Sequence, residues 1–156
     1  MPRDMQVRRR GTFQRRQRGA TILEFAIGAL VILGTSFAVI DFGRLLWTHN
    51  ALSDAARQGA RYAVSNSLTS GTTTAIKNTV MYGTVAAGSK PIVSGLTASE
   101  VVITYDNIGL GRGTATVKVT GHRFYFLTGL FALSVQMPVY QTTLTGETMG
   151  FAPPHI

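Results

Sequence analysis

An apolar run over residues 20–40 constrains this chain more than any other feature, because Glu24 is the only charged side chain among its 21 residues. As an α-helix with a rise of about 1.5 Å per residue, the run would be roughly 31 Å long. That length is enough to cross the hydrocarbon core of a bilayer. The sequence therefore predicts one membrane-spanning helix near the N-terminus, with the lipid bilayer as a partner.

The segment before this run is strongly basic. Seven of the 15 Lys+Arg residues precede Gly19, whereas the chain from Ala20 onward has a formal charge of only +2. Basic residues beside a membrane-spanning helix stay on the cytoplasmic side of the membrane. We therefore interpret residues 1–19 as a topological signal, either disordered or bound to the membrane surface, and not as a nucleic-acid-binding arm. The body from Asp41 onward is expected to lie outside the cytoplasm.

The helical pattern continues beyond the apolar run. Residues 41–64 contain no proline, and their apolar and small side chains recur at spacings of three and four, as on one face of an amphipathic helix. After Leu52 this face consists of small residues, namely Ala55, Ala56, Gly59, Ala60 and Ala63. Arg57 and Arg61 lie on one side of it, and Asp54 can pair with Arg57. We expect neighbouring structure to approach the helix backbone closely here.

The remaining residues, 65–156, predict a small α+β domain. We expect a loop over 65–74, a short helix over 74–87 with Ile76, Val80 and Val85 on one face, and a second loop over 88–97. A two-residue period then predicts strands over 100–105 and 114–120, joined by a hairpin loop over 106–113. A further strand is predicted over 135–145, with Pro138 at an edge or a bulge. The predicted fold class is α+β, with a long N-terminal transmembrane helix and a small antiparallel sheet of three or four strands.

An aromatic cluster, Phe124 to Phe126, follows the second predicted strand. Such side chains next to Arg123 and His122 could stack nucleic-acid bases, but alternate residues of a strand more often fill a core. We favour the core interpretation, with a turn over 127–133 tucked under the sheet.

One short motif gives the N-terminal region a functional interpretation. It is Arg18-Gly19-Ala20-Thr21-Ile22-Leu23-Glu24-Phe25. A carboxylate in a membrane helix costs about 2.5–3.5 kcal/mol, and Glu24 is close enough to the basic edge to reduce this cost by snorkelling. Snorkelling does not account for the glycine at the abrupt change from basic to apolar sequence. Cleavage after Gly19 would create a cation, the α-amino group of Ala20, one helical turn from Glu24 or beside Glu24 of a neighbouring chain.

This motif resembles the class III leader of type IV pilins and pseudopilins. The resemblance implies that a prepilin peptidase cuts between Gly19 and Ala20. It also implies that Glu24 guides assembly by setting the register between subunits.

Three further stretches resemble the TadE family of tight-adherence (type IVc, or Flp) pilus proteins. They are Leu23-Glu24-Phe25-Ala26, Asp41-Phe42-Gly43-Arg44-Leu45 and Asn50-Ala51-Leu52-Ser53-Asp54-Ala55-Ala56-Arg57-Gln58-Gly59-Ala60-Arg61-Tyr62-Ala63. The resemblance implies a pseudopilin or minor pilin whose helix packs through Phe25, Ala55, Ala56, Arg57, Gly59, Ala60 and Arg61.

The same resemblance implies a location and a domain organisation. The protein would be a single-pass protein of the bacterial inner membrane with a cytoplasmic leader (1–19) and a transmembrane helix (20–40). A helical extension (41–64) and a small domain (65–156) would lie in the periplasm. Its partners would be other pilins and Tad-type assembly subunits, either within an extracellular pilus or during its assembly.

Two other interpretations remain open. The chain can be an unprocessed membrane anchor, a structural subunit of an envelope secretion or pilus machine. Alternatively, Ser36-Phe37-Ala38 fits a small-x-small cleavage site, and cutting there would release a secreted binding module. The mature N-terminus distinguishes the three interpretations, because they require Ala20, Met1 and Val39 respectively.

No catalytic pattern is found in the sequence. The chain contains no cysteine, and its three histidines, His49, His122 and His155, lack the spacing of metal ligands. The glycines of residues 109–113 lead into a strand and not into a helix, so a hairpin is favoured over a phosphate-binding loop. We therefore expect no enzyme, no metal or other cofactor, no small-molecule substrate and no nucleic-acid partner.

Overall fold

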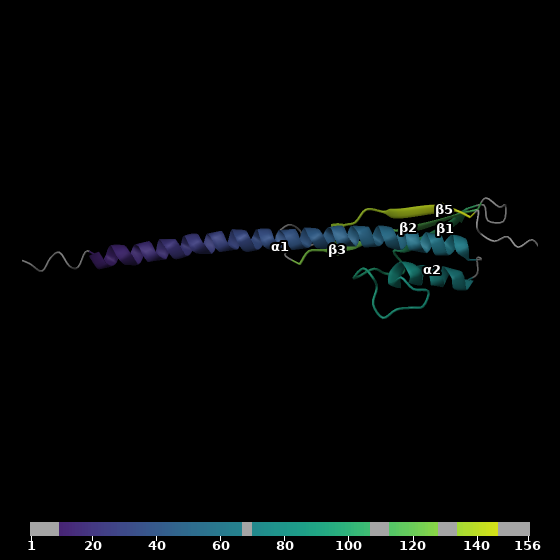
Figure 1. Cartoon of the computed structure of the whole chain (residues 1–156), viewed down its shortest axis with the longest axis horizontal. Helices are drawn as coiled ribbons and strands as arrows, with labels where there is room; N and C mark the ends of the chain where they lie inside the picture. Colours follow the sequence, from purple (N-terminus) through teal and green to yellow (C-terminus); the bar gives the residue numbers. More distant parts are fainter. Residues whose placement is uncertain (1–9, 67–69, 107–112, 128–133, 147–156) are drawn as a thin grey trace, which may run out of the picture. The chain divides into compact units, whose positions relative to one another are not determined.

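The computed structural model describes residues 10–66, 70–106, 113–127 and 134–146. The chain divides into two compact units, Met1–Phe42 and Gly43–Ile156, and each is described by itself. Helix α1 (Arg10–Ser65) runs through the first unit and contributes its C-terminal part to the second (Figure 1).

Helix α1 begins inside the basic segment, so the expected disorder was wrong for residues 10–19, whereas binding of this segment to the membrane surface stays a prediction. Arginine and glutamine have favourable helix propensities, and a glycine costs only about 1 kcal/mol. Because the apolar run already provides a helical nucleus, extension toward the N-terminus adds one hydrogen bond per residue without a second nucleation step. The basic segment therefore continues the helix back to Arg10.

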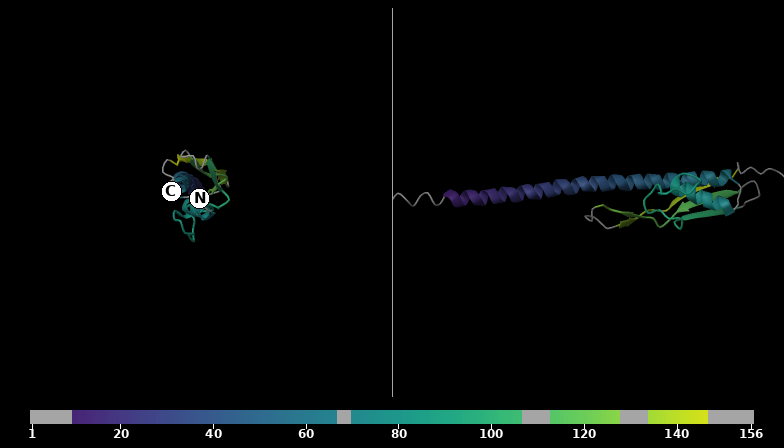
Figure 2. Two further views of the ribbon diagram at one scale, coloured as in Figure 1. Left: turned by 90° about the vertical axis from the view of Figure 1, so that its right-hand side faces the viewer. Right: turned by 90° about the horizontal axis from the view of Figure 1, so that it is seen from below.

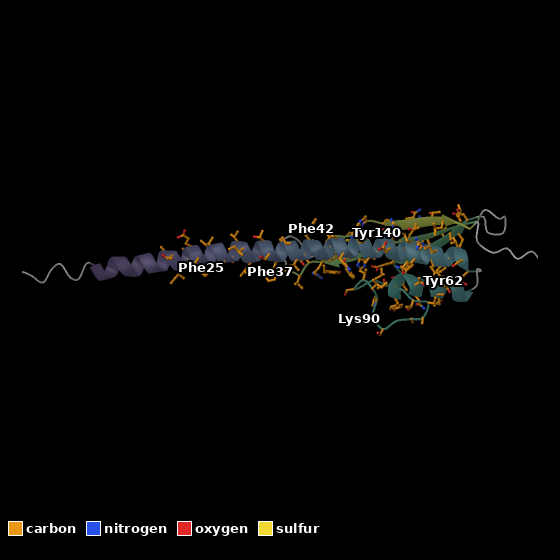
Figure 3. All side chains as sticks on the ribbon, in the orientation of Figure 1. Phe25, Phe37, Phe42, Tyr62, Lys90 and Tyr140 are labelled. Carbon is orange, nitrogen blue, oxygen red and sulfur yellow. The ribbon has the colours of Figure 1, made fainter. Side chains whose placement is uncertain are left out.

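The first unit exposes its apolar side chains. Phe25 is 78% and Leu30 is 73% exposed, and Phe25 and Phe37 project from the helix surface in Figure 3. Among the described residues, one helix is long and apolar enough to cross a membrane, over Gly19–Ser65, and none of its most apolar window is buried. A signal sequence near the N-terminus also meets these criteria of length and composition.

The second unit combines helix α2 (Ser70–Tyr82) with two small antiparallel sheets. Strands β1 (Val101–Asp106), β2 (Thr114–Val119) and β5 (Tyr140–Thr145) form a three-stranded sheet in the order β1-β2-β5. Strands β3 (Arg123–Tyr125) and β4 (Ser134–Gln136) form a separate two-stranded sheet. The strands and α2 gather around the C-terminal part of α1 (Figure 2). The predicted α+β class and the small antiparallel sheet are confirmed.

Strands β1 and β2 pair as a hairpin, with Asp106 opposite Thr114 and Val101 opposite Val119. This confirms the predicted pairing, although most of its connecting loop lies outside the described residues. The predicted turn over 127–133 also lies outside them, apart from its first residue.

The single strand predicted over 135–145 was wrong, because β4 and β5 belong to different sheets. Pro138 lies between them and cannot donate a ladder hydrogen bond. The backbone N–H of Met137 instead donates to the carbonyl oxygen of His122 at 2.9 Å. The chain then leaves β4 and reaches the three-stranded sheet as β5.

The predicted bounds of the second helix were also wrong, since α2 starts and ends earlier than expected. Ile76 and Val80 are fully buried, as their spacing predicts, but Val85 lies beyond the helix and is half exposed. Gly83 has a φ of +71°, and its N–H donates to the carbonyl oxygen of Thr79 at 2.9 Å. A glycine in this left-handed conformation ends a helix at little cost.

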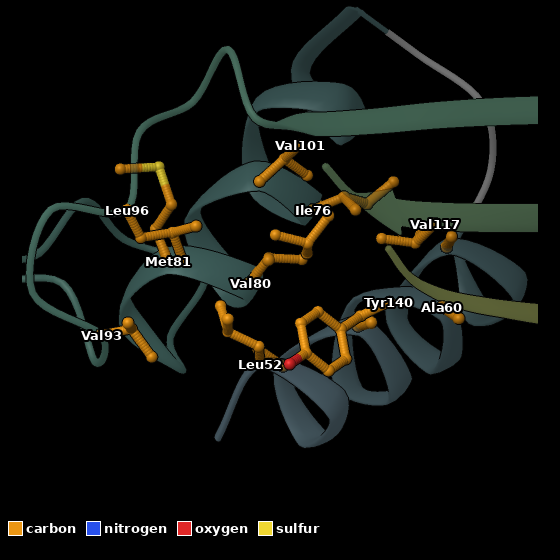
Figure 4. Packing of buried hydrophobic residues seen from close by; sticks show 14 of the residues in the cluster. Leu52, Ala60, Ile76, Val80, Met81, Val93, Leu96, Val101, Val117 and Tyr140 are labelled. Carbon is orange, nitrogen blue, oxygen red and sulfur yellow. The ribbon is translucent and has the colours of Figure 1, made fainter. Parts of the chain in front are cut away.

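One hydrophobic cluster joins α1, α2 and the three-stranded sheet (Figure 4). Its fully buried large members are Leu52 from α1, Ile76 and Val80 from α2, and Val117 from β2. Phe124 is buried and its neighbour Tyr125 is exposed, so the core interpretation of the aromatic cluster is confirmed for Phe124. The core lies entirely within the second unit.

Candidate functional site

The predicted processing and register residues lie on the N-terminal part of α1. Gly19, Ala20, Glu24 and Phe25 are all exposed. Ala20 and Glu24 are four residues apart in a continuous helix, so both side chains lie on the same face. Within the described part of the chain, Glu24 forms no ion pair or hydrogen bond. Its carboxylate is therefore open to a cation supplied by processing or by a second subunit.

The predicted helix-packing residues separate into three groups. Phe25 is exposed in the first unit, whereas Ala55, Ala56, Gly59 and Ala60 are buried in the core of the second. The third group, Arg57 and Arg61, lies on the surface of the second unit. The expected Asp54–Arg57 contact is present, with 3.9 Å between Oδ1 and Nη1, and both side chains are well exposed. An exposed pair at this distance adds little stability.

Gly59 is the point of closest approach between α1 and its neighbours. A Cβ atom built on Gly59 would lie 2.4 Å from Cγ2 of Val80 in α2 and 3.4 Å from Cγ1 of Val117 in β2. No side chain larger than hydrogen fits without displacing one of these valines. The small face of α1 is thus filled by α2 and the sheet of the same chain.

The second unit contains a buried histidine–carboxylate contact that the sequence does not predict. His122 is only 4% exposed, and its Nδ1 lies 3.3 Å from Oε2 of Glu100. The same carboxylate oxygen accepts the backbone N–H of Thr97 at 3.0 Å. The sequence predicts Glu100 as the first residue of a strand. Thr97 and Glu100 have the spacing at which a Glu carboxylate three residues later accepts the backbone N–H of a Thr, and this is the signal of a turn. The contact holds the start of β1 against the segment that leads into β3.

His49 on α1 is bound to β5. Its Nδ1 lies 2.8 Å from the hydroxyl oxygen of Tyr140, and the two rings meet edge to face at 5.2 Å. His49 therefore helps to pack α1 against β5. Burial raises the pKa of Tyr140 above its ordinary value, and burial does the same for Tyr105.

A cleft of about 170 Å³ opens within the second unit, between the first turns of its α1 segment and β3. Its walls carry two guanidinium groups and two aromatic polar side chains. These residues are Arg44, Trp47, Arg123 and Tyr125. The Arg44 guanidinium carbon lies 5.3 Å from the centroid of the Phe124 ring, a cation–π distance. The sequence analysis considered Arg44 and Arg123 only singly, because 79 positions separate them in the chain.

Among the described residues, no group of three or more His, Asp or Glu side chains is placed to hold a metal ion. Among these residues, the buried His122–Glu100 pair has no third His, Asp or Glu placed to complete a metal site. What the geometry does provide is an exposed apolar helix, an exposed carboxylate on it and a basic, aromatic cleft.

The comparison with known protein families matches a part of helix α1. The family model described as TadE-like protein matches residues 19–61. No curated protein and no solved structure matches the chain. The match suggests a membrane-anchored protein associated with the Tad pilus, a class whose members have structural and not enzymatic roles. Over residues 19–61, helix α1 of this chain is therefore TadE-like.

Proposed function

We propose that the protein is a pseudopilin or minor pilin that takes part in assembly of a tight-adherence pilus after cleavage by a prepilin peptidase. One observation carries the proposal: Gly19, the change from basic to apolar sequence and the exposed Glu24 occur together within the TadE-like segment. In the mature protein the helix would be stored in the bilayer and would then pack among the helices of other subunits.

The orientation follows from charge. The basic residues before Gly19 stay in the cytoplasm, and the second unit then lies in the periplasm of a bacterial inner-membrane protein. In domain terms, residues 1–19 are the leader, 20–40 the span, 41–64 the helical extension and 65–156 the small periplasmic domain. This arrangement exposes the bond after Gly19 at the cytoplasmic face.

Gly19 also suits cleavage physically. A peptidase requires an extended backbone, but residues 10–65 form one helix. Glycine costs a helix about 1 kcal/mol relative to alanine, so the helix opens more easily at Gly19 than at the residues beside it. No Cβ-sized neighbour lies within 4 Å of Gly19, so the bond is accessible once the backbone opens.

After cleavage, the α-amino group of Ala20 becomes a cation four residues from Glu24. Pairing within one chain offsets part of the cost of burying the carboxylate, and pairing with the next subunit fixes the axial register of two helices. Either pairing requires a free Ala20 amine, so processing and assembly are coupled. Phe25 and other exposed apolar side chains then supply the contact between helices.

The first test is the intact mass and N-terminal sequence of the protein from membranes of its own host. A chain that begins at Ala20 is the expected result. A chain that begins at Met1 would replace the proposal with that of an unprocessed structural subunit. The uninterrupted course of α1 through Gly19 favours this second candidate. A chain that begins at Val39 would identify a secreted module.

The second test separates assembly from insertion. Glu24→Gln should leave membrane insertion intact and reduce pilus formation at least tenfold, because the neutral amide cannot pair with the amine. Asp54→Asn is the matched control, since it removes an exposed carboxylate from the same helix outside the apolar run. Normal pilus formation by Glu24→Gln would refute the register mechanism.

A further inference from the structure

We propose that the cleft between α1 and β3 binds the phosphate head group of an anionic phospholipid at the membrane surface. The inference rests on the membrane insertion that the proposed function includes. It concerns residues outside the processing and register machinery.

The cleft lies close to the membrane along α1. Arg44 and Trp47 follow the end of the apolar run by four and seven residues, which corresponds to about 6 and 10 Å along the helix axis. When residues 20–40 cross the hydrocarbon core, Arg44 lies at the depth of the head groups and Trp47 lies just beyond their outer edge. Both residues line the cleft.

The chemistry of the cleft matches a phosphate ester. Arg123 adds a second guanidinium group from β3, and guanidinium groups bind phosphate oxygens through paired N–H donors. Among the described residues that line the cleft, two are arginines and none is acidic. Asp41 lies one helical turn before Arg44, but it is not a lining residue. The walls of the cleft therefore carry net positive charge.

The aromatic residues match the membrane–water interface, where the head groups lie. Trp47 is 57% exposed and Tyr125 is 64% exposed, although both border a cleft next to the core. Tryptophan and tyrosine are enriched at this level of a bilayer because one end of each ring is apolar and the other is polar. Leu127, which is 68% exposed, continues the apolar surface directly after Tyr125.

The site also accounts for Arg44, whose placement opposes the topology. Basic residues are disfavoured on the outer side of a membrane helix, but Arg44 stands just past the span. A basic residue gains free energy near anionic lipids, and this gain requires no cytoplasmic location. Arg44 and Arg123 would thus hold the base of the second unit against the lipid surface.

The test uses Trp47, which is the only tryptophan of the chain. The full chain is reconstituted in nanodiscs of phosphatidylcholine with a minor fraction of phosphatidylglycerol. In one set the phosphatidylglycerol carries brominated acyl chains. In the other set an equal amount of phosphatidylcholine carries them, so that total composition is identical. Quenching of Trp47 fluorescence then reports which lipid lies beside the cleft.

We expect stronger quenching when phosphatidylglycerol carries the bromine. Arg123→Gln should reduce the preference about fivefold, as should Arg44→Gln. The matched control is Arg61→Gln, which removes an exposed arginine of the same helix away from the cleft and should retain the preference.

Equal quenching by the two labelled lipids would overturn the head-group site and leave the proposed function standing, since the mass of the processed chain is measured separately. Preference retained by both cleft variants would also overturn the site. No quenching by either label would overturn membrane insertion, and with it both proposals.

Discussion

Gly59 shows how a single hydrogen atom can determine a packing distance. Gly59→Ala places a methyl group 2.4 Å from Cγ2 of the fully buried Val80. Overpacking of a core costs about 1–3 kcal/mol, of which alanine returns about 1 kcal/mol in helix propensity. We expect a net loss of up to about 2 kcal/mol in the free energy of unfolding, measured by thermal unfolding in detergent micelles.

Gly43→Ala is the matched control for this substitution. Gly43 lies in the same helix, but a Cβ atom there meets nothing within 4 Å. Its alanine variant should gain up to about 1 kcal/mol from helix propensity alone. A Gly59→Ala protein as stable as Gly43→Ala would contradict the close approach of α1 to α2.

Tyr140, which is buried, and Tyr105, which is partly buried, make the second unit sensitive to alkaline pH. Burial raises the pKa of Tyr105 and of Tyr140 above the value near 10 that an unfolded chain shows. Below about pH 10 both states keep these protons, and the stabilisation is complete. Above it the unfolded chain loses protons first, so the free energy of unfolding falls as pH rises through the folded pKa values.

Tyr105→Phe checks this cause. Among the described residues, the Tyr105 hydroxyl is the one buried side-chain oxygen or nitrogen without a hydrogen-bond partner. The variant should therefore be as stable as the parent at pH 7 or more stable by up to about 1 kcal/mol. It should also lose less stability between pH 9 and about 11 in chemical unfolding. An unchanged alkaline loss would assign the effect to other groups.

At the scale of elements, the spacing of apolar and small residues predicted which side chains of one helix or strand are buried together. The small residues after Leu52 and the alternation of Ala115, Val117 and Val119 each specify one buried side, and each is buried. The ends of elements were predicted less well. Helix propensity carried α1 back to Arg10, and the left-handed Gly83 ended α2 before Val85. Both helix ends depend on the local conformational energy of the backbone. The spacing of apolar residues carries no information about that energy.

The candidate site shows the same division. Gly19 and Glu24 were identifiable because their chemistry is contiguous in sequence. The cleft and the His122–Glu100 contact were not, because each joins residues from separate elements whose meeting depends on how β3 folds against α1. Pro138 indicated an edge or a bulge in the strand predicted over 135–145. Only the pairing of β5 with β2 shows that this proline separates two sheets.

Glu100 links the turn before β1 to the segment that enters β3. Glu100→Ala removes the acceptor for the Thr97 N–H and leaves the buried His122 without its partner. A loss of about 1–3 kcal/mol in the free energy of unfolding is expected in urea titrations. Asp106→Ala, at the exposed end of the same strand, serves as control and should change stability by less than about 0.5 kcal/mol. Equal effects of the two variants would show that the link contributes nothing.

At the scale of the whole molecule, the core belongs to one unit. Every member of the hydrophobic cluster lies between Leu52 and Tyr140, within Gly43–Ile156. A fragment of residues 43–156 should therefore fold without the apolar run and stay in solution without detergent. We expect cooperative unfolding with a Tm within about 5 °C of that of the full chain, since a shift of this size corresponds to about 1 kcal/mol. A fragment without a cooperative transition would show that residues before 43 are needed to complete the core.

The close packing of Gly59 and Val117 also bears on the order in which α1 and β2 fold. A helix forms locally within about a microsecond, whereas contacts between residues roughly 60 positions apart form far more slowly. The alanine face of α1 therefore exists before β2 arrives to cover it. During that interval, in a crowded membrane, the face is equally open to β2 of a second chain, so the order of folding decides whether each sheet closes on its own helix.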